Sequence, residues 1–335
     1  MPVTNQHNAV PITIRSITKT YGDVYALDEV DLDVKSGEFL TLLGPSGSGK
    51  TTLLMVLAGF TRPDHGSVLF GESEVIRMPP HKREVGMVFQ NYALFPHMTV
   101  AGNIGFPLRL RGVNKNAALE RVENALGTVQ LGGYGDRRID QLSGGQMQRV
   151  ALARAIVFEP RILLYKRQVY VTHDQREALT MSDRVAVIND GKLMQLDSPR
   201  QIYDQPASTF VANFIGESTL LPVDHRNGQI SYAGNPVDIS GSESKNGRFL
   251  MLRPERLILL SSNNDSTYNT FQGKVKDIVY QGESFLLYVT LIDGTDVAVR
   301  SVSQKDLMAA VPEVGSEIVL GLHPDETVLI PDDNE

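Results

Sequence analysis

One stretch of the sequence has glycines, a lysine and threonines spaced to hold phosphate. "LLGPSGSGKTT" fits the pattern G-x-x-x-x-G-K-[ST], with an apolar run before it and helix formers after it. Its glycines let the backbone curl until several N–H groups point at the same oxygen atoms. We expect Lys50 to reach the β- and γ-phosphates and Thr51 to hold Mg²⁺; the alternative is a glycine-rich turn without a ligand. The predicted nucleotide-binding residues here are Gly44, Pro45, Ser46, Gly47, Ser48, Gly49, Lys50, Thr51 and Thr52.

A second candidate anion site opens the segment "QLSGGQMQRVALARAIVFEP". It begins with a Ser-Gly-Gly turn, continues through helix formers and stops at Pro160. The N-terminus of such a helix attracts negative charge. Because one phosphate needs only one such site, the second is predicted to serve a nucleotide held by another subunit. Its residues are Ser143, Gly144, Gly145 and Gln146.

Two different residue patterns along the sequence predict the secondary-structure elements that position these residues. Up to residue 217, short apolar runs alternate with helix-like stretches, which is typical of a sheet covered by helices, an α/β domain. Residues 218–335 show strand alternation and turn signals such as Asp293-Gly294, which predicts a small all-β domain. Within it, "LMLRPERLILL" and "LGLHPDETVLI" repeat one pattern, as strands in equivalent sheet positions would; coincidence is the alternative.

The amino-acid composition excludes several classes of protein and of binding site. The 335 residues carry a formal charge of -7, which argues against a nucleic-acid partner. There is no cysteine, so there is neither a disulfide framework nor a thiolate metal site. We see no signal peptide and no run of about 18 apolar residues that would predict a membrane span. Work at a membrane would therefore need partner chains.

Together these motifs resemble the ATPase subunits of ATP-binding-cassette (ABC) transporters, whose family signature is LSGGQ. The resemblance implies that Tyr21 stacks on adenine and that Gln90, which ends "VGMVFQ", touches Mg²⁺ and faces the membrane partner. It also implies that His173, in "VTHDQREAL", contacts the γ-phosphate. Taken singly, these three residues could equally be a packing tyrosine, a polar loop residue and a core histidine.

The resemblance covers nearly the whole chain. The β-rich tail resembles the OB-like barrel that is appended to importer ATPases of the polyamine, iron and sugar types. "FPHMTVAGNIGFPLRLRGV" and "FIGESTLLPV" resemble the polyamine branch most. The resemblance implies ATP and Mg²⁺ as ligands, a second ATP-binding subunit, transmembrane permease subunits and, indirectly, a solute-binding protein. It also implies a location on the cytoplasmic face of the inner (plasma) membrane, held there through the permeases.

One family element is missing between residues 161 and 174, "RILLYKRQVYVTHD". In the family, an apolar run here ends with Asp and Glu, followed by a Pro-containing loop, a helix and another strand. In this chain Lys166 and Arg167 stand where the acidic pair would be. The shortfall is about 25 to 30 residues, which one helix and its turns would occupy. We favour an internal deletion in the chain or its gene over an omitted loop, because the missing piece belongs to the core.

The loss changes the chemistry expected of the chain. Mg²⁺ prefers carboxylate oxygens, and the attacking water needs a residue that positions it; cations serve neither purpose. Two parallel strands also need a crossover of a dozen or more residues, so the segment would be one merged strand or a strained link. The sequence thus predicts an importer ATPase subunit, for polyamines or for iron(III) or sugar, or a nucleotide-binding subunit defective in hydrolysis. A DNA-repair or translation ATPase fits poorly, because there is no coiled coil and no second cassette.

Overall fold

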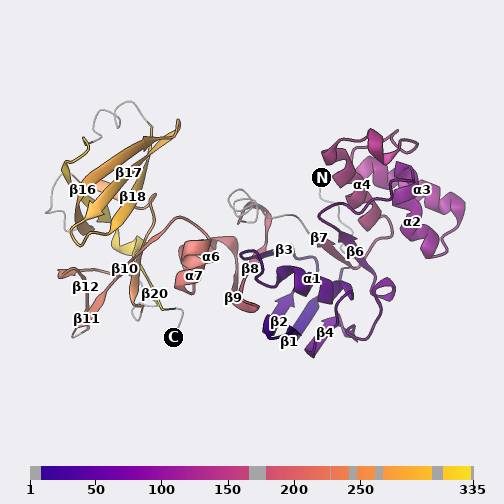
Figure 1. Cartoon of the computed structure of the whole chain (residues 1–335), viewed down its shortest axis with the longest axis horizontal. Helices are drawn as coiled ribbons and strands as arrows, with labels where there is room; N and C mark the ends of the chain where they lie inside the picture. The colour runs from indigo at the N-terminus through magenta and orange to yellow at the C-terminus, as the bar shows by residue number, and fades with distance from the viewer. Residues whose placement is uncertain are drawn as a thin grey trace. The chain divides into compact units, whose positions relative to one another are not determined.

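The computed structural model divides the chain into two compact units, Met1–Leu193 (unit 1) and Met194–Glu335 (unit 2) (Figure 1). It describes residues 9–165, 179–226, 228–240, 247–260, 267–303 and 312–332. Unit 1 mixes helices and strands, and the described part of unit 2 is mostly strands. The predicted fold class, an α/β domain followed by a β-rich domain, is therefore confirmed.

An antiparallel sheet opens unit 1. Its apolar residues alternate along the strands, so that one face is buried; Ile14, Leu27 and Val68 are fully enclosed. The strand order in this sheet is β2-β1-β4-β5. The strands are β1 (Ile12–Tyr21), β2 (Val24–Val34), β4 (His65–Phe70) and β5 (Ser73–Glu74).

The described parallel strands of unit 1 pair in two places. β3 (Leu40–Leu43) pairs with β8 (Arg184–Asn189), which continues through a turn into β9 (Lys192–Asp197). β6 (Val85–Val88) pairs with β7 (Ile162–Tyr165). The first part of the segment "RILLYKRQVYVTHD" is thus a strand, and its residues from 166 onward lie outside the described part of the chain.

Helices complete unit 1, and three of them gather beside β6 and β7 (Figure 1). Their shared core is aliphatic, with Ile104, Leu126 and Val150 at its centre. One face of α4 also packs under β6, because Ala151 and Ala155 leave room for Val88. The helices of unit 1 are α1 (Lys50–Ala58), α2 (Val100–Leu110), α3 (Lys115–Thr128) and α4 (Gly144–Ile156), with 3-10 turns η1 (Pro80–Lys82) and η2 (Ile139–Gln141).

Unit 2 begins within β9, and two short helices follow, α6 (Pro199–Asp204) and α7 (Thr209–Phe214). Antiparallel sheets follow, in the orders β10-β14-β20, β11-β12-β13 and β15-β19-β16-β17-β18, around one core. The turn at Asp293-Gly294 joins β17 to β18, as its sequence predicts. The strands are β10 (Thr219–Pro222), β11 (Asp224–Arg226), β12 (Gln229–Tyr232), β13 (Asn235–Pro236), β14 (Phe249–Leu252), β15 (Ile258–Leu260), β16 (Asn269–Tyr280), β17 (Ser284–Leu291), β18 (Asp296–Val302), β19 (Glu317–Leu322) and β20 (Val328–Ile330), with η3 (Pro324–Glu326).

The repeated pattern in unit 2 forms two equivalent strand–turn–strand units. The first copy supplies β14 and β15, and the second supplies β19 and β20. β14 pairs with β20 and β15 pairs with β19, so each strand of one copy meets the opposite strand of the other. The repeat therefore reflects equivalent positions in the sheets rather than coincidence.

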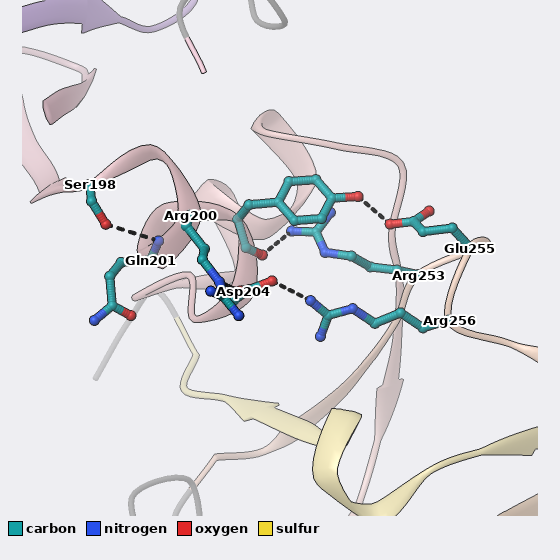
Figure 2. A network of polar contacts seen from close by, with 8 residues as sticks. Ser198, Arg200, Gln201, Asp204, Arg253, Glu255 and Arg256 are labelled. Carbon is teal, nitrogen blue, oxygen red and sulfur yellow. Dashed lines mark hydrogen bonds and ion pairs between the residues drawn. The ribbon is translucent and has the colours of Figure 1, made fainter. Parts of the chain in front are cut away.

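A polar cluster ties α6 to the turn between β14 and β15 (Figure 2). Arg253 donates from Nη2 to the backbone oxygen of Tyr203 at 2.7 Å, and its guanidinium lies 3.8 Å from the centre of the Tyr203 ring. Asp204 pairs with Arg256, and the Tyr203 hydroxyl pairs with Glu255. These contacts place α6 in unit 2, although the predicted domain boundary lies later, at residue 217. The domain boundary at residue 217 remains a prediction from the change in residue pattern along the sequence.

Candidate nucleotide-binding site

The phosphate loop lies between β3 and α1, as the sequence predicts. Gly49 caps the N-terminus of α1 with φ of 104°, in the left-handed region that favours glycine. A Cβ on Gly44 would lie 2.0 Å from the backbone oxygen of Ile188, and one on Gly49 would lie 2.3 Å from that of Ala26. Glycine at both positions is therefore required by close backbone approach.

Lys50 lies inside this loop. Its Nζ donates to the backbone oxygens of Gly44, at 2.9 Å, and Pro45, at 2.7 Å, and to the Ser48 hydroxyl at 2.9 Å. Burial lowers the pKa of the Lys50 ammonium. A partly buried cation enclosed by curled backbone is suited to an anion with several oxygens. The cradle therefore fits a nucleotide phosphate chain.

Tyr21 ends β1 and is exposed, with 55% of its surface accessible. The strands β1 and β2 turn between Tyr21 and Val24, which are paired. The same β2 strand brings Ala26 against Gly49 of the phosphate loop. An exposed aromatic ring near one end of a hairpin that contacts the phosphate loop is compatible with stacking on a base.

The turn between β8 and β9 also touches both parts of this site, a feature that the sequence reasoning missed. Gly191 donates its N–H to the backbone oxygen of Ser48 at 3.1 Å, and its own oxygen accepts from the Asp28 N–H at 2.9 Å. Lys192 forms an ion pair with Asp28 at 3.2 Å. The Asn-Asp-Gly sequence of residues 189–191 signals a turn, but not what the turn contacts.

Gln90 lies just after β6 and is exposed. The backbone that follows it is unusual, since Tyr92 and Ala93 both have positive φ, of 61° and 46°. Arg154 of α4 donates to the backbone oxygens of both residues, at 2.7 Å each. The predicted metal-contacting residue thus begins a loop that is pinned to α4.

The signature turn begins α4, as predicted. Ser143 caps the helix: its hydroxyl accepts from the Gln146 N–H at 3.3 Å, and the Gln146 side chain accepts from the Ser143 N–H at 2.8 Å. Gly144 and Gly145 are exposed, with open space where a Cβ would lie. Among the described residues, no hydrogen bond or ion pair joins this turn to the phosphate loop.

The remaining predicted residues cannot be placed. Lys166, Arg167 and His173 all lie outside the described part of the chain. In the part that the structure describes, no group of three or more His, Asp or Glu side chains is arranged to hold a metal ion. Thr51 and Gln90, the predicted metal-contacting residues, are both exposed.

Family models match two parts of the chain. Residues 27–165 match the ABC transporter model, a range that contains the phosphate loop, Gln90 and the signature turn and ends at Tyr165. Residues 250–330 match the TOBE domain model. No helix in the described ranges is long and apolar enough to cross a membrane.

Curated relatives and solved structures agree with these matches. The spermidine/putrescine import ATP-binding protein PotA of Nitratidesulfovibrio vulgaris is 40% identical over 356 residues, covering 95% of this chain and 94% of that protein. The protein of the same name from Acetivibrio thermocellus is 43% identical over 303 residues, covering 82% of this chain and 85% of that protein. The dimeric ATP-binding cassette MJ0796, bound to ADP and Pi, matches with a TM-score of 0.50 and 25% identity, covering 56% of this chain and 99% of that one. The chain belongs to the ATP-binding proteins of ABC transporters.

Proposed function

We propose that the chain is the ATP-binding subunit of an importer for polyamines such as spermidine and putrescine. The observation that carries this is the intact phosphate loop, in which Lys50 is enclosed by backbone and hydroxyl oxygens. The substrate class rests on relatives that are named as spermidine/putrescine import proteins and that align with this chain over 94% and 85% of their own length.

Each ligand-binding step has a candidate residue in unit 1. Backbone N–H groups of the loop and Lys50 would hold the phosphates, Tyr21 would stack on the base, and Thr51 and Gln90 would contact Mg²⁺. A bound Mg²⁺ would neutralise charge on the β- and γ-phosphates. The signature turn, residues 143–146, is free to face a nucleotide held by a second copy of the chain, an arrangement supported by the dimeric cassette of similar fold.

The proposed partners follow from the same family membership. Transmembrane permease subunits carry the solute, and a solute-binding protein delivers it to them. This subunit binds the permease subunits at the cytoplasmic face of the inner membrane and meets the solute-binding protein only indirectly. The loop after Gln90 is the proposed contact with the permeases. Solute transport itself takes place in those partner chains.

We further propose that this chain binds ATP but hydrolyses it poorly. Lys166 and Arg167 follow the β7 strand, where the family has Asp and Glu. The alignment with the N. vulgaris relative runs over 356 residues although this chain has only 335, so it includes positions that have no counterpart here. The transporter model also stops matching at Tyr165, directly before the two cations.

The packing of β7 supports the same proposal. Parallel strands are normally covered on both faces. In β7, Ile162 and Leu164 are buried, whereas Leu163 and Tyr165 are 44% and 39% exposed. In the part of the chain that the structure describes, one face of this strand is therefore incompletely covered, as expected if a neighbouring core segment is absent.

The binding proposal is tested by titrating the chain with a fluorescent ATP analogue. Lys50→Ala should abolish binding, because it removes the cation that the loop encloses. Lys115→Ala, an exposed lysine at the start of α3, is the matched control and should bind as the wild type does. Equal binding by wild type and Lys50→Ala, with both folded by circular dichroism, would show that the site is assigned wrongly.

A further inference from the structure

The loop after β6 holds two consecutive residues in a backbone conformation that side chains disfavour. Tyr92 and Ala93 have φ of 61° and 46°, and neither is glycine. Left-handed backbone at such residues costs free energy and persists only when surrounding contacts impose it. Local hydrogen bonds, from the Tyr92 N–H to Phe89 and from the Ala93 N–H to Asn91, close the loop into tight turns.

The contact that imposes this conformation comes from the signature helix. Arg154 of α4 donates from Nη1 to the Ala93 oxygen and from Nη2 to the Tyr92 oxygen, each at 2.7 Å. A planar guanidinium fork matches two neighbouring carbonyl groups in a way that a single ammonium group does not. Burial lowers the pKa of Arg154, so losing these acceptors would leave a desolvated cation.

We propose that Arg154 is a positioning residue that holds residues 90–93 so that Gln90 meets the metal of bound Mg·ATP. This rests on the proposed function, because the role of Gln90 is part of it. Through Arg154, a shift of α4 and its signature turn changes the position of Gln90. The contact thus joins the helix that begins with the signature turn to the metal-contacting loop, although Arg154 and Ala93 are 61 positions apart in sequence.

A second arginine on the same helix provides a matched control. Arg149 donates from Nη1 to the backbone oxygens of Val129 and Gln130, at 3.3 and 3.4 Å. Gln130 also has positive φ, of 57°. Arg149 therefore also joins α4 to two consecutive backbone oxygens, through one nitrogen rather than a fork, but in a loop that carries none of the proposed nucleotide-binding residues.

The experiment compares Arg154→Met and Arg149→Met in the full chain by two measurements. Amide hydrogen exchange should accelerate in residues 89–94 of Arg154→Met and around residue 130 of Arg149→Met. ATP affinity is then measured with Mg²⁺ and with EDTA. In the wild type and in Arg149→Met, ATP should bind more tightly with Mg²⁺ than with EDTA. In Arg154→Met this gain in affinity should be at least about fivefold smaller, which is the lower range of coupling between sites. The ATP affinity measured with EDTA should be unchanged.

Arg154→Lys keeps the charge and stem, so it serves if the methionine variant does not fold. It should also lose the Mg²⁺ gain, because one ammonium group does not replace the fork. The proposal is overturned if both Arg154 variants keep the wild-type Mg²⁺ gain, if Arg149→Met loses it equally, or if the wild type shows no gain. Absence of ATP binding by the wild type would instead reject the proposed function itself.

Discussion

At the scale of single residues, Gly191 sets the spacing between two parts of the site. It is hydrogen-bonded to Ser48 of the phosphate loop and to Asp28 of β2. A Cβ at Gly191 would lie 3.1 Å from the backbone oxygen of Tyr25 and 3.2 Å from that of Ala26, so this backbone would have to shift by a few tenths of an ångström. Gly37 has nearly the same φ, +75° against +78°, but nothing within 4 Å of a Cβ.

We predict that Gly191→Ala weakens ATP binding more than Gly37→Ala does. Both variants incur the backbone strain of about 1 kcal/mol that alanine meets at positive φ. Only Gly191→Ala shifts the β1–β2 hairpin that carries Tyr21. Only this variant should therefore weaken the contact with the base while leaving the contact with the phosphates intact. Calorimetric titration with ATP and with tripolyphosphate checks this. Gly191→Ala should bind ATP more weakly than the wild type does, and it should bind tripolyphosphate with the wild-type affinity. Equal losses for the two glycine variants would contradict the prediction.

Asp64 gives a pH-dependent prediction at the same scale. It forms an ion pair with Lys19 at 2.8 Å and accepts from the backbone and hydroxyl of Thr20, next to Tyr21. The Lys19 contact, followed by those from Thr20, lowers the pKa of the Asp64 carboxyl from 3.8 to about 2. The folded state therefore favours the carboxylate, and the stabilisation is complete above about pH 4 and lost as the pH falls through 2.

Carboxyl NMR signals recorded from pH 6 to 1.5 would test this assignment. The Asp64 signal should titrate with a midpoint near 2, well below those of exposed aspartates. The melting temperature of the wild type should fall between pH 4 and 2, partly because Asp64 becomes protonated. In Asp64→Asn that part of the fall should be absent. A midpoint near 3.8 would show that the contacts with Lys19 and Thr20 do not persist in solution.

At the scale of elements, the cluster around Arg253 joins α6 to the β14–β15 turn. Arg253 is wholly buried, and a Cβ on Gly216 would lie 2.4 Å from its Nη1. Gly216→Ala should therefore destabilise the protein by about 1–3 kcal/mol, the usual cost of overpacking. Chemical denaturation of the full chain measures the change. Gly132→Ala, where a Cβ would meet nothing within 4 Å, is the control and should stay near wild type.

The elements also show how far sequence reasoning reaches. The phosphate loop, the capping of α4 and the Asp293-Gly294 turn were predictable, because each depends on residues close together in the sequence. Neither the Arg154 contact with Tyr92 and Ala93 nor the contacts that the Gly191 turn makes with Ser48 and Asp28 could be predicted. Both depend on distant segments meeting through backbone atoms, which leave no residue-type pattern.

At the scale of the whole molecule, ATP turnover is expected to depend on the segment between β7 and residue 179. Inserting an acidic pair, a loop and a helix after Leu164 should raise both ATP turnover and thermal stability, because it supplies the crossover that parallel strands need. Replacing only Lys166 with Asp and Arg167 with Glu should not, since the chain stays too short. Comparing the melting temperature and phosphate release of both variants checks this. Full turnover in the double substitution would refute the need for a crossover.

The central claim is that the chain binds ATP through an intact phosphate loop yet hydrolyses it poorly. It is tested most directly by measuring phosphate release from Mg·ATP at a concentration where an ATP analogue saturates the same sample. We predict that the nucleotide site of the wild type is fully occupied, and that the wild type releases phosphate no faster than the Lys50→Ala variant does. Rapid Mg²⁺-dependent release by the wild type that Lys50→Ala abolishes would contradict the claim, and would show that another carboxylate, such as Asp174, positions the water.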